Sequence, residues 1–164
     1  MHTIEEYVSI IEELKMVVPD MALSTDIIVG YPGESESEFE DTLALMESIK
    51  FNNSYMFSYS PRPNTPAQDF PDSVPQSVKS SRLQRTIELQ KKLTIDQGKK
   101  FIGKEVDVLV ESESFKAGLD FRGRNAQYWS VNFIGDRALI SPGDIVKVLV
   151  EEASGHMLKG KAVL

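Results

Sequence analysis

The sequence predicts a chain of α/β plus all-β class, in which strand–helix units are followed by a small β-barrel. Up to about residue 102, helical periodicity alternates with short β-branched runs. After Gly103, the pattern changes to short strands separated by glycine turns. These observations divide the chain into residues 1–74 (α/β part), 75–102 (linking helix) and 103–164 (barrel).

The first predicted element is an amphipathic helix from Thr3 to Val18. Thr3 and Glu6 have the spacing of a capping box, in which each side chain satisfies a backbone N–H of the other residue. Apolar residues recur at helical spacing along the segment. Pro19 then ends the helix, because proline lacks the backbone donor that a further turn requires.

The stretch from Met21 to Gly30 is predicted to be a strand, and the loop after it is the first candidate site. Ile27-Ile28-Val29 is a continuous apolar run, which suits a strand buried on both faces. Gly30 and Gly33 permit backbone conformations and close approaches that a side chain forbids. Ligands of α/β folds gather where strands end in such loops. The segment therefore predicts a ligand beside this turn.

A second helix and a second strand follow. Ser35 and Glu38 form a second capping box, the helix ends near Lys50, and Ser54–Tyr59 is the strand. This order is a piece of a repeated strand–helix array. Two parallel strands cannot bury both faces and satisfy both edges of a sheet. Either the segment is a small α+β domain or, as we favour, it is the end of a larger barrel whose first part is missing.

A proline-rich crossover from Ser60 to Pro75 is predicted to be neither strand nor helix, because proline lacks a donor and restricts the preceding residue. A long polar helix from Gln76 to about Ile102 follows. We expect its bases to lie on a solvated face, with an RNA-facing role as the alternative. These bases are Lys79, Arg82, Arg85, Lys91, Lys92, Lys99 and Lys100.

The C-terminal strands indicate a small barrel of a size that binds single-stranded nucleic acid through aromatic and arginine side chains. The segment from Arg122 to Phe133 supplies that mixture. The alternative is that Phe133 and Trp129 are core residues.

Charge and cysteine content limit the possible functions. The net charge of −7 argues against nucleic-acid attraction by the whole surface. Residues 1–102 carry net −6 and residues 103–164 only −1, so the barrel can still gather its arginines on one face. The absence of cysteine excludes disulfides and thiolate-held iron–sulfur clusters within these residues. Without a membrane-length apolar run or a signal-peptide pattern, we expect a soluble, cytoplasmic protein with no membrane partner.

Several motifs, in order along the chain, resemble the radical-SAM tRNA methylthiotransferases. Asp26–Glu34 resembles their "DIIVGFPGE" segment, Tyr59–Ala67 their "YSPRPGTPA", and Arg82–Arg85 their "RLQRL". Val131-Asn132-Phe133 and the flanking segments from Gly103 to Gly160 resemble a TRAM domain. Two departures are Asn64, where the family has Gly, and Asn125, where it has Thr.

The resemblance implies the C-terminal β/α units of a partial radical-SAM barrel, followed by a five-stranded TRAM β-barrel. In such enzymes two [4Fe–4S] clusters and S-adenosylmethionine add a methylthio group to C2 of N6-isopentenyladenosine next to the anticodon. The TRAM domain grips the tRNA anticodon stem-loop. Because the cluster ligands are absent here, we expect this fragment to be inactive alone and to need the missing N-terminal part of the enzyme. The alternatives are a stand-alone TRAM-type RNA-binding module, or a methylthiotransferase acting on threonylcarbamoyladenosine tRNA or a ribosomal protein.

The resemblance also suggests site residues in the first part of the chain. Ile28 is expected to pack on the adenine of S-adenosylmethionine, and Gly30 to let the backbone approach it. Asp26 either is a buried acid held by hydrogen bonds or orients the substrate. Arg62, displayed rigidly between two prolines, is expected to contact the substrate.

In the barrel, Arg122, Arg124 and Lys159 are the expected phosphate contacts, and Phe133 is a candidate stacking platform. We expect His156 to be a turn residue, and no catalytic or metal-binding residue is predicted within the chain.

Overall fold

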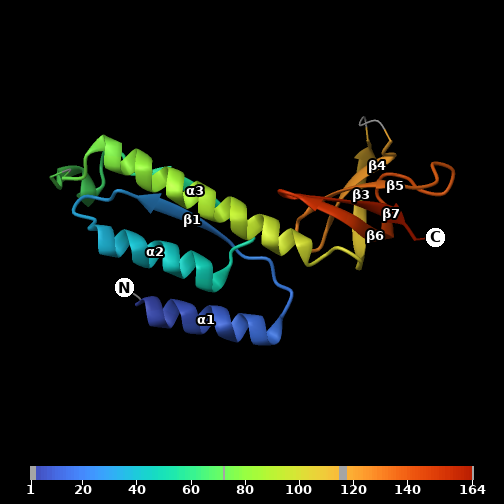
Figure 1. Cartoon of the computed structure of the whole chain (residues 1–164), viewed down its shortest axis with the longest axis horizontal. Helices are drawn as coiled ribbons and strands as arrows, with labels where there is room; N and C mark the ends of the chain where they lie inside the picture. Colours follow the sequence, from blue (N-terminus) through green and yellow to red (C-terminus); the bar gives the residue numbers. More distant parts are fainter. Residues whose placement is uncertain (1–2, 72, 115–117, 164) are drawn as a thin grey trace. The chain divides into compact units, whose positions relative to one another are not determined.

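The computed structural model describes residues 3–71, 73–114 and 118–163, which form two compact units (Figure 1). The first unit runs as far as residue 93, apart from residues 20–22, and the second contains the chain from residue 94 onward. Among the described residues, no helix combines the length and hydrophobicity that a membrane crossing requires. The elements of the first unit are α1 (Ile4–Val17), β1 (Ser24–Val29), α2 (Glu36–Ile49), β2 (Asn53–Ser58) and most of α3 (Gln76–Lys99).

Local sequence signals set the ends of the first two helices. Thr3 caps α1 and Ser35 caps α2, each in the reciprocal capping box that the sequence predicts. α2 ends at Ile49 and is capped by Lys50, which adopts a left-handed conformation with φ 59°. The proline-rich crossover contains one 3₁₀ turn, η1 (Pro66–Asp69), so the prediction of no helix there is wrong for four residues. Proline is tolerated at the first position of a helical turn, because its missing N–H has no partner there.

β1 and β2 form a parallel two-stranded sheet with one covered face and one open face. Ile27 and Val29 point into a core that also contains residues of α1, α2 and α3. Ile28 points the other way, as alternation along a strand requires, and is 57% exposed. The predicted burial of this strand on both faces is therefore wrong among the described residues, because all three helices cover the same side.

A polar stripe of α3 is buried, which corrects part of the prediction for this helix. Lys79 and Arg82 are only 3% and 5% exposed, so the expected solvated face is wrong for these two bases. The same stripe continues through Thr86 and Gln90, where Gln90 bonds the Ser54 hydroxyl and the Phe51 carbonyl. The remaining bases of the helix are exposed or half-buried, as predicted.

The described part of the second unit contains a closed five-stranded barrel with strand order β3-β4-β5-β7-β6, which confirms the predicted barrel. β5 and β7 are parallel, and the other neighbouring pairs are antiparallel. The sequence also predicts a strand from Phe115 to Gly123, and the first residues of that range lie outside the described residues. The strands are β3 (Glu105–Glu113), β4 (Phe121–Asn125), β5 (Ser130–Ile134), β6 (Ile145–Ser154) and β7 (Met157–Ala162).

Two strand glycines lie directly beneath bulges and let the barrel close. β3 has a register shift between Val110 and Ser112, and β6 has one between Val150 and Glu152. A Cβ on Gly123 would lie 2.9 Å from the Leu109 carbonyl carbon, and closer still to its oxygen. In the same way, a Cβ on Gly160 of β7 would lie 2.9 Å from the carbonyl carbon of Leu149 on β6. Any side chain at either position would push into a neighbouring backbone.

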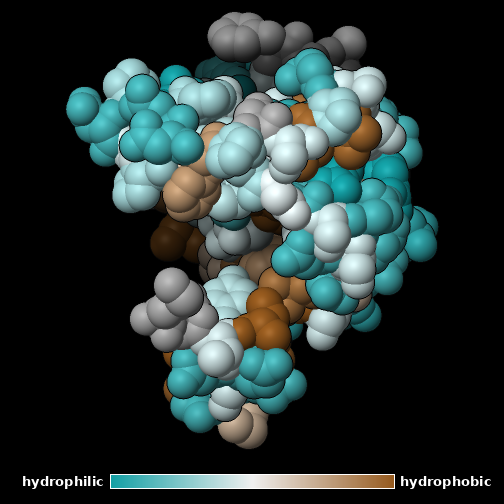
Figure 2. All heavy atoms as spheres, turned by 90° about the vertical axis from the view of Figure 1, so that its left-hand side faces the viewer, coloured by the Kyte–Doolittle hydropathy of each residue, from teal (hydrophilic) through white to brown (hydrophobic). Residues whose placement is uncertain are grey.

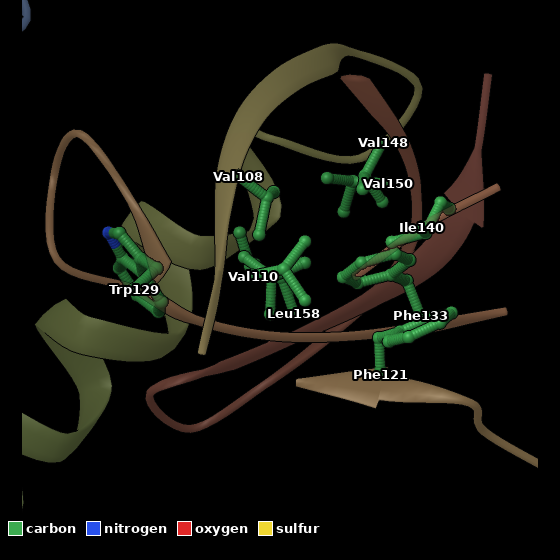
Figure 3. Close-up of a cluster of buried hydrophobic side chains, with 10 residues drawn as sticks. Val108, Val110, Phe121, Trp129, Phe133, Ile140, Val148, Val150 and Leu158 are labelled. Carbon is green, nitrogen blue, oxygen red and sulfur yellow. The ribbon is translucent and has the colours of Figure 1, made fainter. Parts of the chain in front are cut away.

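The barrel core is formed by ten buried apolar side chains (Figure 3). Phe121 and Phe133 stack with their ring centroids 5.5 Å apart. Trp129 lies to one side, where its ring packs on Gly98 at the end of α3 and on Phe101. Trp129 is therefore a core residue, as one of the two readings of the sequence expected.

Candidate functional site

The loop after β1 is held closed by a buried ion pair with α3. The Glu34 carboxylate accepts a hydrogen bond from the Gly30 backbone N–H (2.6 Å) and pairs with the Arg82 guanidinium (2.7 Å). Arg82 also donates to the Glu34 backbone carbonyl at 3.0 Å. Because both side chains are almost fully buried, the pair operates away from bulk water, where charge-assisted bonds are strong. The start of α3 therefore fixes the conformation of residues 30–34.

The ion pair extends outward along α2 and α3. Glu36 accepts from Arg82 (3.1 Å) and from Arg85 (2.7 Å), and Arg85 also pairs with Glu40. Hydrogen bonds from Arg85 and then Arg82 lower the pKa of the Glu36 carboxyl below its ordinary value. Both guanidinium groups lie over the Phe39 ring, 5.3 and 4.7 Å from its centroid. This network joins the two helices through side chains far apart in sequence.

Gly30 is required by the chain's own packing. Its φ of +76° is left-handed, and a Cβ there would lie 2.5 Å from Cγ of Lys79. The buried Lys79 side chain passes over the glycine, and its ammonium lies 5.2 Å from the centroid of the Tyr59 ring. The close approach that the sequence predicts at Gly30 is thus made by Lys79, and contact with a cofactor at Gly30 stays a prediction.

The other predicted residues of this part lie on exposed surfaces. Ile28 belongs to the open sheet face, opposite Phe57 in register, and both are more than half exposed. Asp26 is exposed on the same face, so the interpretation as a buried acid is wrong; no further strand or helix among the described residues covers it.

Figure 2, viewed from the side of the first unit, shows hydrophobic side chains at the surface inside a hollow. A pocket lined by residues of α1, β1 and α2, including Asp26 and Ile28, opens in this unit.

Arg62 is exposed in the crossover between Pro61 and Pro63. Its guanidinium makes no ion pair among the described residues, while its backbone carbonyl accepts from the Thr65 hydroxyl at 2.8 Å. Asn64 has a φ of +65°, the left-handed conformation that the family's glycine at this position suggested. The loop therefore exposes the Arg62 cation, which has no ion-pair partner in the described part of the chain, in a conformation fixed by its own turn.

The register of the barrel brings two of the predicted contact residues, Arg122 and Lys159, into one row with Asn132. Arg122 of β4 pairs with Asn132 of β5, and Asn132 pairs with Lys159 of β7, so the three form one row across the strands. Arg124 lies in the adjacent row. We call the surface formed by Arg122, Arg124, Asn132 and Lys159 the β4–β5–β7 face.

The cations of this face differ in whether a carboxylate pairs with them. Arg124 pairs with Glu111, and Lys159 pairs with Glu152, each at 3.0 Å. Arg122 is exposed and makes no ion pair among the described residues. An anion approaching this face therefore meets Arg122 without having to displace a carboxylate.

Phe133 cannot be the stacking platform, whereas the nearby Tyr128 exposes its ring. Phe133 is 0% exposed in the barrel core, so the core interpretation of this residue is the correct one. Tyr128 is 76% exposed in the turn before β5, and the Arg124 guanidinium lies 4.6 Å from its ring centroid. Its φ of +67° is unusual for a bulky residue. The turn thus displays an aromatic ring and a cation together, an arrangement suited to an unpaired base.

His156 lies in the turn between β6 and β7, as predicted, with its ring 5.6 Å from that of Trp129. Partial burial there lowers the pKa of the imidazole. Among the described residues, no group of three or more His, Asp or Glu side chains is arranged to hold a metal ion.

The chain is similar to known proteins along its whole length. Residues 99–163 match the model of the TRAM domain. Proteins named tRNA-2-methylthio-N(6)-dimethylallyladenosine synthase from Acetivibrio thermocellus, Flavobacterium johnsoniae and Magnetococcus marinus are each 41% identical to the chain over 99% of its length. The matches cover 33%, 34% and 37% of those proteins, so the chain spans about a third of their length.

Proposed function

We propose that the chain is the C-terminal part of a tRNA methylthiotransferase, because residues 99–163 match the TRAM domain model and the whole chain is similar to such enzymes. The enzyme would add a methylthio group to C2 of N6-isopentenyladenosine next to the anticodon of tRNA. In this proposal the first unit forms part of the wall of the radical-SAM barrel, and the second unit binds the anticodon stem-loop.

The open face of the β1–β2 sheet is the observation that carries the enzyme part of the proposal. Ile28, Tyr55 and Phe57 expose apolar side chains there, and among the described residues both outer edges of the sheet are unpaired. Exposed apolar faces and free strand edges of this kind mark surfaces that further protein or a ligand covers. If the chain were a free-standing RNA-binding module, which is the alternative, the exposure of this apolar face would have no explanation.

The residues present fit part of the cofactor set. An exposed apolar side chain such as Ile28, at the end of a strand beside a glycine loop, suits contact with the adenine of S-adenosylmethionine. The two [4Fe–4S] clusters do not fit, because the chain has no cysteine. We therefore assign this chain the tasks of positioning and binding, with cluster ligation by another part of the enzyme.

Loss of the gene is expected to remove the methylthio group from N6-isopentenyladenosine in total tRNA. Nucleoside analysis by mass spectrometry measures this directly, and methylthiolated threonylcarbamoyladenosine serves as the internal control because it should persist. Loss of that second nucleoside would instead indicate a methylthiotransferase that acts on threonylcarbamoyladenosine tRNA. Loss of a ribosomal-protein modification, with both nucleosides intact, would indicate one that acts on a ribosomal protein. If every methylthio modification persists, the enzyme assignment is wrong.

The Arg122→Gln variant is expected to weaken binding of an anticodon stem-loop RNA regardless of loop sequence. Arg122 is the cation of the β4–β5–β7 face that makes no ion pair among the described residues, so its phosphate contact carries no competing carboxylate. Loss of one phosphate contact lowers the slope of log K against log salt concentration by about one. Fluorescence anisotropy over a salt series measures both quantities.

The Lys147→Gln variant is the matched control for Arg122. Lys147 is an exposed cation of the same barrel that pairs with Asp107 at 3.1 Å, on strands β6 and β3. Its removal changes the net charge by the same amount away from the β4–β5–β7 face. Equal effects of the two substitutions on the salt slope would show that only net charge matters.

A further inference from the structure

One asparagine of the β4–β5–β7 face is buried although it points away from the barrel core. Asn132 is only 3% exposed, while its chain neighbours Val131 and Phe133 both lie in the core cluster. Since side chains alternate along a strand, Asn132 faces outward, as does its exposed cross-strand partner Arg122. Burial of a polar side chain on the outer face of a strand requires an explanation.

The carboxamide of Asn132 makes no hydrogen bond among the described residues. Every fully enclosed side-chain nitrogen or oxygen of the described residues has a hydrogen-bond partner. Because the Asn132 amide has none, its atoms must keep a small contact with solvent. Buried polar groups in native proteins are nearly always hydrogen-bonded. A recessed carboxamide with free donor and acceptor atoms is thus prepared for a partner from outside.

The barrel contains a second buried asparagine, which shows what a structural role looks like. Asn125 is 4% exposed, and its Oδ1 accepts from the Trp129 backbone N–H at 2.9 Å. Its Nδ2 donates to Oε1 of Gln127 at 3.0 Å. The Asn125 amide is used within the turn, while that of Asn132 is not. The two residues therefore differ in function although they are equally buried.

The surroundings of Asn132 suggest the chemistry of its partner. Arg122 and Lys159 lie on either side of it in the same row of the sheet. Two cations suit the phosphates of a nucleotide chain, and a carboxamide between them presents one donor beside one acceptor. That pair matches the N6–H and N7 atoms of adenine, whereas the same edge of guanine offers two acceptors, which suit arginine.

We propose that Asn132 reads the edge of an unpaired adenine in bound RNA, with Arg122 and Lys159 holding the flanking phosphates. This inference rests on the proposed RNA-binding function of the barrel and adds a base preference to it. Asn132 acts here as a specificity-determining residue, and Arg122 and Lys159 determine overall affinity.

The Asn132→Leu variant is expected to reduce affinity for single-stranded oligoadenylate by at least about fivefold, since a bidentate base contact gives about 1–3 kcal/mol of discrimination. Its affinity for oligouridylate and oligocytidylate of equal length should change less than twofold, which removes the preference of the unsubstituted chain. Its thermal midpoint should not fall, because the amide makes no internal hydrogen bond. Fluorescence anisotropy and thermal unfolding measure these effects.

The Asn125→Leu variant provides the matched control, because it should lower the thermal midpoint of the barrel. Asn132→Ser, which is smaller and polar, should reproduce the loss of adenine preference in a second folded variant. If the unsubstituted chain binds the three oligonucleotides equally and with a salt slope, the base preference is overturned and RNA binding stands. If it binds none of them, both proposals fail. An Asn132→Leu chain that unfolds like Asn125→Leu would also overturn the inference, because it would show a structural role.

Discussion

Replacing Gly160 by alanine is expected to unfold the barrel or to lower its free energy of unfolding by about 3 kcal/mol or more. The added Cβ would lie 2.9 Å from the Leu149 carbonyl carbon and closer still to its oxygen. The obstacle is backbone, which cannot rotate away as a side chain can. The barrel is closed, so β6 cannot move outward without breaking its pairing with β3. Small-to-large changes in well-packed interiors already cost about 1–3 kcal/mol when only side chains must move.

Trp129 makes this effect measurable in the barrel alone. It is the only tryptophan of the chain and is 2% exposed in the barrel core, so its fluorescence reports the unfolding of the second unit. Urea titration followed by this signal gives the change in free energy. Gly155→Ala is the control, because nothing lies within 4 Å of a Cβ there and only its φ of +56° is unfavourable, at about 1–2 kcal/mol. If both variants lose the same stability, the bulge is not the reason for Gly160.

Much of this barrel follows from sequence, but the role of Gly160 does not. The periodic strands and glycine turns indicate a small closed sheet, and the register then places the glycines. Gly160 lies inside β7, opposite the bulge of β6, and not in one of the glycine turns. The need for glycine arises from Leu149, on another strand, and no local pattern records that approach. The capping boxes of α1 and α2 could be predicted because their partners lie three residues apart.

The candidate site was predictable in its residue types and less so in its geometry. Val131-Asn132-Phe133 alternates apolar and polar residues, so one face must be core, and the core face contains both Val131 and Phe133. An exposed aromatic was expected within this segment, and the structure provides it at Tyr128. The recessed position of Asn132 depends on the strands beside it, β4 and β7, and could not be inferred from its own neighbours in sequence.

Replacing Arg82 by methionine is expected to destabilise the first unit by about 3–5 kcal/mol, the cost of removing one partner of a buried ion pair. Glu34 would remain buried with its charge uncompensated, and its carboxylate also holds the Gly30 N–H. Methionine is unbranched and flexible and fills the space of the aliphatic part of arginine, so lost packing contributes less than the lost charge. Hydrogen exchange of the Gly30 and Glu34 amides reports the loop, and far-UV circular dichroism reports the helices.

Two further variants separate the buried pair from ordinary surface charge. Arg85→Met removes a guanidinium that is 40% exposed and pairs with Glu36 and Glu40, so its cost should be about 1 kcal/mol or less. The double variant Arg82→Met, Glu34→Gln should recover part of the loss, because a neutral amide no longer needs the buried cation. No recovery, together with equal costs for Arg82 and Arg85, would mean that the polar stripe of α3 is stabilised by packing alone.

The sequence suggested a solvated helix face because helical periodicity carries no information about acidic partners 46 and 48 residues away. The same long-range pairing lets a polar helix position the loop at the end of β1, which is where the proposed cofactor contact lies.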